Sequence, residues 1–438
     1  MLTDTALVSV IIPSHNRKAI LRQTLDALAK QTYPLEKFEV IVVLDGCTDG
    51  SIDMLCEYQA PLTLRTIEQD SGGAAIARNQ GASLAKGELL IFLDDDIETS
   101  PGFVQAHRHA HLGSNNRVVI GYIPPIPSRP NTYFALELQG WWEKKFQPMQ
   151  HPGLRFCYTD LLSGNFSIRR VNFYSLGGFN SNFLVHEDYE LGARLMKAGL
   201  DFAFTQAATG LHHEQPDLNR AMQRKLQEGI ADVHLGRIYP ELIPTLLICR
   251  LLINSRLPSR VLQYLEFRSP RLGKWIALIA LQALPVLEKA RMLSMWRRFF
   301  SGLSGYWYWK GVVQELATQK AVQDFLANKP SNAQPLEKPE FVIDLSQGLD
   351  QAEQTLDRLR PDSVSIYNGE KLIGCMPSQP GAERWRGAHL RPFLIEYSLF
   401  HLLEAFASQG IIHLPMNIEE FAAFTQKDVP YPERWDQV

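Results

Sequence analysis

A short apolar run that ends in three consecutive aspartates constrains this chain more than any other stretch. Residues 89–93 read LLIFL, and Asp94, Asp95 and Asp96 follow directly. A continuous apolar run of this length is typical of a strand buried on both faces of a parallel sheet. Carboxylates at the carboxyl end of such a strand lie where open α/β sheets bind their ligands. Because neighbouring like charges repel unless a cation or strong donors share them, the aspartates form either a solvated acidic turn or a ligand site.

The residues before this run alternate between strand-like and helix-like patterns. The predicted strands span 8–13, 38–44, 62–67 and 89–93, and the predicted helices between them span 19–31, 51–58 and 74–85. This alternation predicts an α/β domain with a doubly wound, largely parallel sheet. No G-x-G-x-x-G follows the first strand, so the dinucleotide fingerprint is missing. A nucleotide site formed by Asp45, the Arg78 region and the aspartates is still compatible with the pattern.

A second acidic group and a histidine pair follow later in the chain. Residues 186–199 read HEDYELGARLMKAG, whose apolar spacing predicts a helix that ends at Gly199. Glu187 and Asp188 then lie at its N-terminus, where free N–H groups and the macrodipole favour ionised carboxylates. A plain helix cap is the simpler alternative. His212 and His213 follow the next predicted strand, either as a structural pair or as a source of an imidazole ligand for a metal.

The stretch between residues 124 and 146 is rich first in proline and then in aromatic residues. The aromatic residues are Tyr133, Phe134, Trp141, Trp142 and Phe146. Aromatic side chains at this density usually pack in a core or a loop. The alternative hypothesis is a flexible flap over a site.

Composition excludes several classes of protein. The 438 residues suffice for more than one domain, and the net charge of −3 gives no global sign of nucleic-acid binding. The five cysteines are scattered and form no C-x-x-C, which fits a reducing compartment and argues against disulfides or a zinc knuckle. The first residues resemble a strand rather than a signal peptide. No apolar stretch reaches the roughly 20 residues that span a bilayer, so we expect a protein that is not integral to a membrane.

Residues 250–310 differ from the rest of the chain in charge. They contain eleven arginines and lysines against two glutamates, a local charge of +9, interleaved with Trp275, Trp296, Phe299 and the YWYW cluster at 306–309. A basic, aromatic, amphipathic helical segment suits the surface of an anionic membrane. Nucleic acid is the other polyanion it could meet, but no other feature supports it. The third alternative is a helical tail that packs its apolar face on the preceding domain.

Five motifs occur together in the order and approximate spacing of one family. They are VSVIIPSHNR, LDGCTDGS, FLDDDIETSPGF, LLSGNFSIRR and HEDYELGARLMKAG. Over roughly residues 7–240 the chain resembles the family 2 glycosyltransferases. The resemblance implies a GT-A glycosyltransferase domain over 1–240, a Rossmann-like nucleotide-binding half joined to an acceptor half. We expect a helical, basic and aromatic region at 241–328, a linker at 329–339 and a small α+β module at 340–438, in which His389 and Arg391 are structural.

The resemblance also implies roles for particular residues. It places Pro13 and Asp45 on the nucleotide base, with Ser14, Asn16 and Arg78 beside the donor. It places either Asp94 or Asp95 on the ribose and Asp96 on a divalent cation, Mn²⁺ or Mg²⁺, whose shell is completed by His212 or alternatively His213. It gives Asp188 the role of catalytic base, with Glu187 beside it. The chain departs from the family pattern where the usual Asp-Asp-Gly-Ser reads Leu44-Asp45-Gly46-Cys47, and it lacks a Q-x-x-R-W motif, which argues against a processive synthase.

The expected activity is inverting transfer of a sugar from a nucleotide-diphosphate sugar to a glycan or lipid-linked acceptor in polysaccharide or cell-envelope biosynthesis. A hard cation neutralises the leaving diphosphate, and one carboxylate, ionised at neutral pH with a reference pKa of about 3.9, activates the acceptor hydroxyl. A sugar-phosphate nucleotidyltransferase and a non-catalytic nucleotide-sugar-binding scaffold are the alternatives. The expected location is cytoplasmic, at the cytoplasmic face of the membrane if 250–310 binds lipid.

Overall fold

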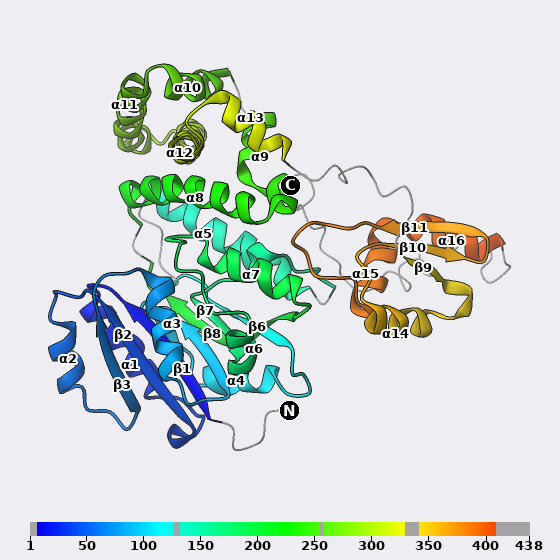
Figure 1. Ribbon diagram of the computed structural model, residues 1–438, viewed down its shortest axis with the longest axis horizontal. Coiled ribbons are helices and arrows are strands. Elements are labelled where there is room, and N and C mark those ends of the chain that lie inside the picture. The colour runs from blue at the N-terminus through cyan, green and yellow to red at the C-terminus, as the bar shows by residue number, and fades with distance from the viewer. Residues whose placement is uncertain are drawn as a thin grey trace. The chain divides into compact units, whose positions relative to one another are not determined.

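The computed structural model describes residues 7–126, 132–151, 153–214, 216–254, 257–328 and 341–408 (Figure 1). The chain divides into a larger unit, 1–150 with 156–329, and a smaller unit, 151–155 with 330–438. The predicted linker at 329–339 lies outside the described residues, as do most of the proline-rich stretch before residue 132 and the end of the predicted module beyond residue 408.

An eight-stranded sheet is the frame of the larger unit. Its strands are β1 (Val8–Ser14), β2 (Phe38–Asp45), β3 (Thr63–Gln69), β4 (Leu89–Leu93), β5 (Ile97–Thr99), β6 (Arg117–Tyr122), β7 (Asn165–Arg169) and β8 (Asp201–His212). They are arranged in the order β3-β2-β1-β4-β7-β6-β8-β5. Helices α1 (Lys18–Leu28), α2 (Ser51–Glu57) and α3 (Ala74–Leu84) connect the first four strands. The predicted alternation of strands and helices, and with it the α/β class, is confirmed.

Strand β4 is the apolar run that precedes the aspartates, and all five of its residues are buried. It pairs in parallel with β1, which in turn pairs in parallel with β2. On its other side it pairs antiparallel with β7, and β7 pairs antiparallel with β6. The expectation of a largely parallel sheet holds throughout β3-β2-β1-β4. Beyond β4 the sheet is mixed, because β6 pairs in parallel with β8, whereas β7 and β5 pair antiparallel with their neighbours. An apolar run indicates that a strand is buried but not the direction of its neighbour, so the antiparallel pairs were not predicted.

The second half of this unit supplies α4 (Phe103–Ala110), α5 (Tyr133–Phe146), α6 (Arg170–Ser175), α7 (Glu187–Lys197) and α8 (Leu218–Ile238). The aromatic stretch, for which core or loop packing and a flexible flap were the alternatives, is the helix α5, and three of its aromatic side chains are core. Trp142 and Phe146 are buried, and Trp142 stacks on Phe146 with ring centroids 5.8 Å apart. A helix presents these aromatic residues to the core because they lie one turn apart.

The described residues between α8 and position 328 form the helices α9 (Leu247–Asn254), α10 (Leu257–Arg268), α11 (Pro270–Lys289), α12 (Leu293–Leu316) and α13 (Gln319–Ala327). Helix α12 packs closely along α8, and α10 and α11 pack on α12 (Figure 1). Trp296 and the aromatic residues 306–309 are buried in this packing. The prediction that they lie on a basic, aromatic surface is therefore wrong for these five side chains, which are core. In the part of the chain that is described, no helix combines the length and apolarity needed to cross a membrane.

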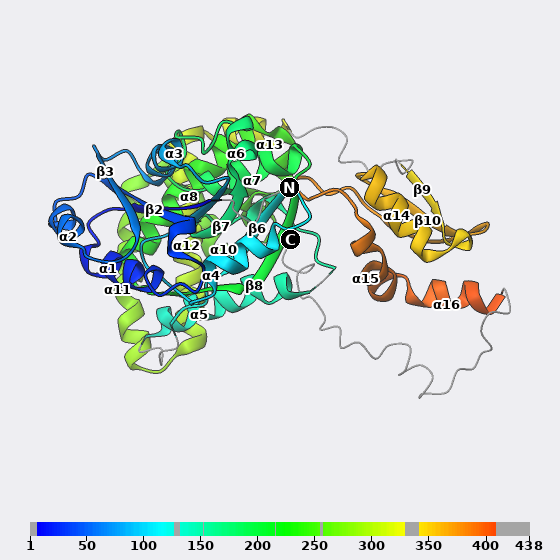
Figure 2. The ribbon, with the colours of Figure 1, turned by 90° about the horizontal axis from the view of Figure 1, so that it is seen from below.

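In its described part, residues 341–408, the smaller unit has a three-stranded sheet and three α-helices. Its strands, in the order β11-β10-β9, are β9 (Phe341–Asp344), β10 (Val364–Asn368) and β11 (Lys371–Met376), and its helices are α14 (Leu349–Leu359), α15 (Gly387–Tyr397) and α16 (Leu399–Ser408). Figure 2 shows α14 beside the sheet, as Figure 1 does. His389 is buried against Glu383, and Arg391 forms ion pairs with Glu353 and Asp350, which are structural contacts.

Candidate functional site

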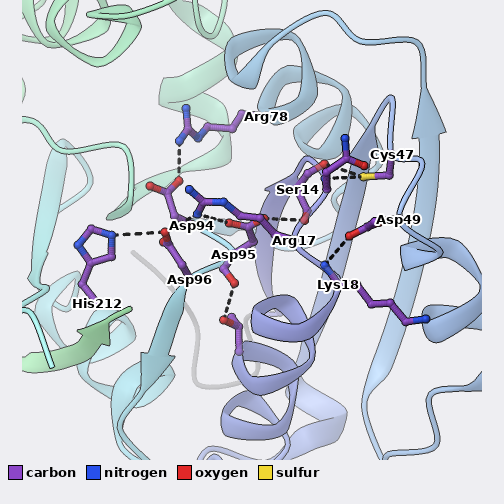
Figure 3. A network of polar contacts seen from close by, with 12 residues as sticks. Ser14, Arg17, Lys18, Cys47, Asp49, Arg78, Asp94, Asp95, Asp96 and His212 are labelled. Carbon is purple, nitrogen blue, oxygen red and sulfur yellow. Dashed lines mark hydrogen bonds and ion pairs between the residues drawn. The ribbon is translucent and has the colours of Figure 1, made fainter. Parts of the chain in front are cut away.

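The three aspartates at the end of β4 have three different sets of partners (Figure 3). The Asp94 carboxylate accepts a hydrogen bond from Arg78 at 2.7 Å, and its side chain is 37% exposed. Asp95 is buried and accepts from the Ser14 hydroxyl at 2.6 Å. Asp96 is also buried and lies 3.5 Å from His212 Nε2. The run is therefore not a solvated acidic turn, because two of its three side chains are shielded from solvent.

Arg17 is a member of this cluster that the sequence patterns did not single out. Its guanidinium donates to Asp95 at 3.1 Å and also to Asp96. Arg17 directly follows the loop after β1, and β1 and β4 are parallel neighbours, so their carboxyl ends meet at one edge of the sheet. The available signal was the basic residue four positions after Pro13, at the end of the SHNR turn. The positive charge of the Arg17 guanidinium thus offsets the repulsion between these two carboxylates.

Burial and charge act in opposite directions on the aspartates. Burial raises the pKa of Asp95 to about 7, although Arg17 and Ser14 oppose the shift. Burial also raises the pKa of Asp96, but the hydrogen bond and charge of His212 together with Arg17 outweigh it, so the pKa of Asp96 is lowered. Burial disfavours the charged form of His212, and Asp96 reverses this effect and raises its pKa. Of the two buried carboxylates, Asp96 is therefore the one whose ionised form is favoured, and it faces His212.

Asp45, at the end of β2, is fixed by the loop that follows β3. Its carboxylate accepts from the Gly72 and Gly73 backbone N–H groups at 2.7 and 2.9 Å and from Gln69 Nε2 at 2.7 Å. Gly73 has φ +90°, a conformation that favours glycine and turns its N–H toward Asp45. The structure thus places Asp45 at the same sheet edge as the end of β4, with its carboxylate held by three donors.

The loop after β1 brings Pro13, Ser14 and Asn16 to this edge as well. Pro13 is half-buried and Asn16 is exposed. Asn16 has φ +53°, and its side-chain oxygen accepts from the Thr48 backbone N–H at 2.7 Å, which joins the β1 and β2 loops. Asparagine tolerates this left-handed conformation better than most residues.

Arg78 on α3 joins the aspartate cluster to the helix α7. It is buried, and its guanidinium donates to Asp94 at 2.7 Å and to Glu187 at 2.8 Å. Burial and the neighbouring Asp188 raise the pKa of Glu187, and Arg78 opposes that shift. Arg78 was expected beside the donor. The structure shows that its guanidinium is engaged by two carboxylates, so it acts on the site by holding them.

Asp188 lies at the N-terminus of α7, as the sequence predicted. One carboxylate oxygen accepts from the Tyr189 backbone N–H at 2.9 Å and the other from the Ser163 backbone N–H at 3.4 Å. The side chain is only partly buried, whereas Glu187 is buried. A partly exposed carboxylate that accepts from backbone N–H groups is held in place and is still accessible to a hydroxyl.

His186, the residue before this pair, has φ +59° at the N-cap of α7. Its Nδ1 lies 3.0 Å from Asp232 on α8, and Asp232 also accepts from the buried Tyr308 hydroxyl on α12 at 2.6 Å. The start of α7 is therefore tied through side chains to the two long helices α8 and α12.

The two histidines at the end of β8 face different partners. His212 points at Asp96 (Figure 3). His213 Nε2 instead lies 3.0 Å from Glu98 on β5. The His212 ring lies perpendicular to the ring of Trp142 on α5, with ring centroids 5.2 Å apart. Of the two histidines that the sequence left as alternatives, only His212 turns its side chain toward the aspartates, whereas His213 meets Asp96 through its backbone N–H.

These residues fit a divalent cation that is shared with a bound phosphate. Asp96 Oδ1 and His212 Nδ1 are buried and have no hydrogen-bond partner among the described residues. The described residues contain no ready-made cluster of three histidine, cysteine or carboxylate ligands. A cation that bridges phosphates needs only one or two protein ligands, because phosphate oxygens and water supply the others. Asp96 and His212 provide that number.

Known protein families and individual proteins are similar to this chain. The family described as glycosyl transferase family 2 matches residues 9–177, and the N-terminal domain of galactosyltransferase matches residues 145–215. Validoxylamine A glucosyltransferase of Streptomyces hygroscopicus subsp. jinggangensis is 30% identical, with 68% of this chain and 77% of that protein covered. An uncharacterized glycosyltransferase of Bacillus subtilis, YfnE, is 29% identical over 48% of this chain and 65% of its own length. Among solved structures, a mannosyltransferase of Pyrobaculum calidifontis in complex with GDP-Man and Mn²⁺ superposes with a TM-score of 0.47 at 18% identity, covering 69% of this chain and 86% of that one.

Proposed function

Since this chain belongs to glycosyltransferase family 2, we propose that it transfers a sugar, with inversion, from a nucleotide-diphosphate sugar to a hydroxyl of a glycan or lipid-linked acceptor. The chain is thus a glycosyltransferase with an α/β fold of the GT-A type, and polysaccharide or cell-envelope biosynthesis is the proposed setting. One observation carries the assignment of the site. Arg78 joins Asp94, in the acidic loop after β4, to Glu187, next to Asp188. The leaving-group end and the attacking end are thereby held in one network.

The donor would lie along the edge where β1, β2 and β4 end. We assign the base to Pro13, Asn16 and Asp45 and the ribose to Asp95. Asp95 is bonded to Ser14, next to Pro13, whereas Asp94 is turned toward Arg78 on the side of Glu187. Asp95 therefore faces the nucleotide side of the cluster, which favours it over Asp94 for the ribose.

Asp96 and His212 would hold the cation, Mn²⁺ or Mg²⁺. The bound cation would neutralise the charge that develops on the departing diphosphate. The protein residues prepare this step. His212 is oriented by Trp142 and lies 3.5 Å from Asp96, and the unpartnered Asp96 Oδ1 is free to coordinate. Arg17 holds the carboxylates until a cation arrives.

Asp188 would take the proton of the acceptor hydroxyl as that oxygen attacks the sugar. Its backbone donors fix the carboxylate, and its partial exposure admits an acceptor. A positioned general base contributes about 10²–10⁴-fold in rate. Asp188→Asn should therefore lower transfer by at least about 100-fold while a nucleotide-sugar donor with Mn²⁺ still raises the melting temperature as in the wild type.

Asp217 supplies the matched control, because it also lies at a helix N-terminus and accepts from two backbone N–H groups. Asp217→Asn should retain transfer. An Asp188→Asn enzyme that turns over at the wild-type rate would remove Asp188 from the mechanism.

We also propose a partner and a location for the chain. The helical region 241–328 carries the basic excess of residues 250–310, which suits an anionic membrane. The five cysteines are scattered along the sequence without a C-x-x-C motif, a pattern that fits a reducing compartment. Together these features support the cytoplasmic face of a membrane as the place of action.

A further inference from the structure

An exposed apolar stripe runs along α11. Leu272, Trp275, Ile279 and Val286 are 50%, 67%, 62% and 65% exposed. Their spacing of three, four and seven residues places them on one face of a helix. Single exposed apolar side chains are normal in a folded protein, but a contiguous stripe of large ones marks an interaction surface.

This stripe is not the face that holds α11 in the protein. Gly273, Ala277, Leu281 and Leu284 form the buried face of α11, and the last three belong to the apolar cluster formed with α5, α8 and α12. Figure 1 shows α12 between α11 and α8, so α11 lies on the outside of the helical region. The helix is thus already packed on one face, and its exposed apolar stripe is not needed for that packing.

Basic side chains border the stripe. Arg271, Lys274 and Lys289 on α11 are exposed. At about 100° per residue they fall on one flank of the stripe, between it and the buried face. Arg291 and Arg298 continue the positive charge beyond the end of α11, and both are exposed. Arg297, by contrast, is paired with Glu137 on α5 at 2.6 Å.

A stripe with this chemistry fits one partner best. A tryptophan and aliphatic side chains enter the boundary between lipid headgroups and acyl chains, and bordering lysines and arginines meet lipid phosphates. Anionic lipids add a favourable free energy of about 1 kcal/mol per basic residue near the surface. A protein partner would cover the apolar stripe as well, but it would not require a positive flank.

We propose that α11 is the membrane-docking surface of this chain, and that Trp275, Ile279 and Val286 insert among the headgroups of an anionic bilayer. This assignment rests on the proposed function, because it names the surface through which that function reaches its membrane. A transferase held at a bilayer meets acceptors that diffuse within it. The surface therefore favours the lipid-linked class of acceptor over a free glycan.

Vesicle flotation of the full chain tests the proposal. The wild type should float with vesicles of phosphatidylcholine and phosphatidylglycerol and much less with phosphatidylcholine alone. Trp275→Glu and Ile279→Glu should each weaken binding by more than about tenfold, because each removes the transfer free energy of one large side chain and adds a charge. Lys274→Glu should weaken binding most at low salt. Val171→Glu is the matched control, since Val171 is 62% exposed on α6 and its variant should float like the wild type.

A second readout locates the inserted residue. Brominated lipid should quench part of the tryptophan fluorescence of the wild type, and Trp275→Phe should remove that quenching while the protein still floats. A wild type that does not float overturns the membrane partner. An Ile279→Glu variant that floats like the wild type overturns the assignment to α11, and so does a dimer in sedimentation velocity that this substitution dissolves. Donor stabilisation by a nucleotide-sugar with Mn²⁺ should be unchanged in Ile279→Glu, so a failure of the docking surface is distinguishable from a failure of the proposed catalytic site.

Discussion

Two buried histidines on the α4 side of the sheet make the stability of this protein sensitive to mild acid. Burial lowers the pKa of His107 to about 4. Burial, together with the charges of His107 and Arg117, lowers the pKa of His111 to about 3. Both side chains face β7, where Ser167 Oγ lies 2.8 Å from His107 Nδ1 and 2.9 Å from His111 Nε2.

The hydrogen bonds fix both rings in the neutral form. Asn165 donates its Nδ2 hydrogen to the Ala208 carbonyl at 3.0 Å, so its Oδ1 is left to accept from His107 Nε2 at 2.8 Å. His107 Nδ1 then accepts from the Ser167 hydroxyl, and Ser167 Oγ accepts from His111 Nε2. A proton added to either ring would place a second donor where the network needs an acceptor or would leave a buried charge unpaired.

The magnitude follows from proton linkage. The unfolded chain binds these protons below its ordinary histidine pKa of about 6.5, whereas the folded chain does not bind them until about pH 4 or lower. Stability is therefore present above about pH 6.5 and falls with pH below it. A pH of about 5 lies about 1.5 units below the histidine pKa of the unfolded chain. At about 1.36 kcal/mol per unit, each histidine then lowers the free energy of unfolding by about 2 kcal/mol. The two histidines together should lower the free energy of unfolding by about 4 kcal/mol, a large part of the stability of a typical domain.

Urea denaturation at about pH 7 and about pH 5 measures this loss. The double variant His107→Gln with His111→Gln keeps polar side chains that do not titrate in this range, so it should lose about 4 kcal/mol less than the wild type between the two pH values. His109→Gln is the matched control, because His109 is exposed on the same helix, and its variant should show the wild-type pH dependence. The reasoning is refuted if the double variant loses as much stability as the wild type.

Two further predictions test the aspartate cluster and the crossing of α8 with α12. Arg17→Gln should tighten the binding of Mn²⁺ alone in calorimetric titration, since the guanidinium no longer competes for Asp96; weaker binding would mean that Arg17 supports the cation instead. Gly311→Ala should lower the free energy of unfolding in urea by at least about 3 kcal/mol, because the added Cβ would lie 2.0 Å from the Leu226 carbonyl oxygen. Gly302→Ala on the same helix is the control, since its Cβ would meet nothing within 4 Å and the substitution should be neutral or stabilising. Equal effects of the two substitutions would contradict the close approach of the helices.

The local patterns of the sequence were enough for the strands β1 to β4 and the helices α1 to α3, but not for the short strand β5. The run at 89–93 is the strand β4 with the same bounds, because a strand buried on both faces must be apolar throughout. The helix α7, which begins at Glu187, could also be predicted, since apolar spacing and a terminal glycine indicate a helix from the local sequence alone. These features depend on neighbours in sequence, and so does the acidic character of Asp94 to Asp96.

The partners of those residues were decided only by the tertiary structure. Arg17 meets Asp95 and Asp96 from a loop about eighty residues away in sequence, and Arg78 reaches Glu187 across more than a hundred residues. The spacing of residues along the chain does not predict such contacts, because they form only when strand ends meet at a sheet edge.

The same limit applies to the aromatic residues of the helical region. Composition gave the YWYW cluster and Trp275 the same character, yet the first is buried and Trp275 is 67% exposed. Which face of a helix is covered depends on the helix that packs against it. The sequence by itself therefore determined which segments fold and where charge gathers, and the tertiary packing decided which charges meet and which apolar side chains are left facing outward.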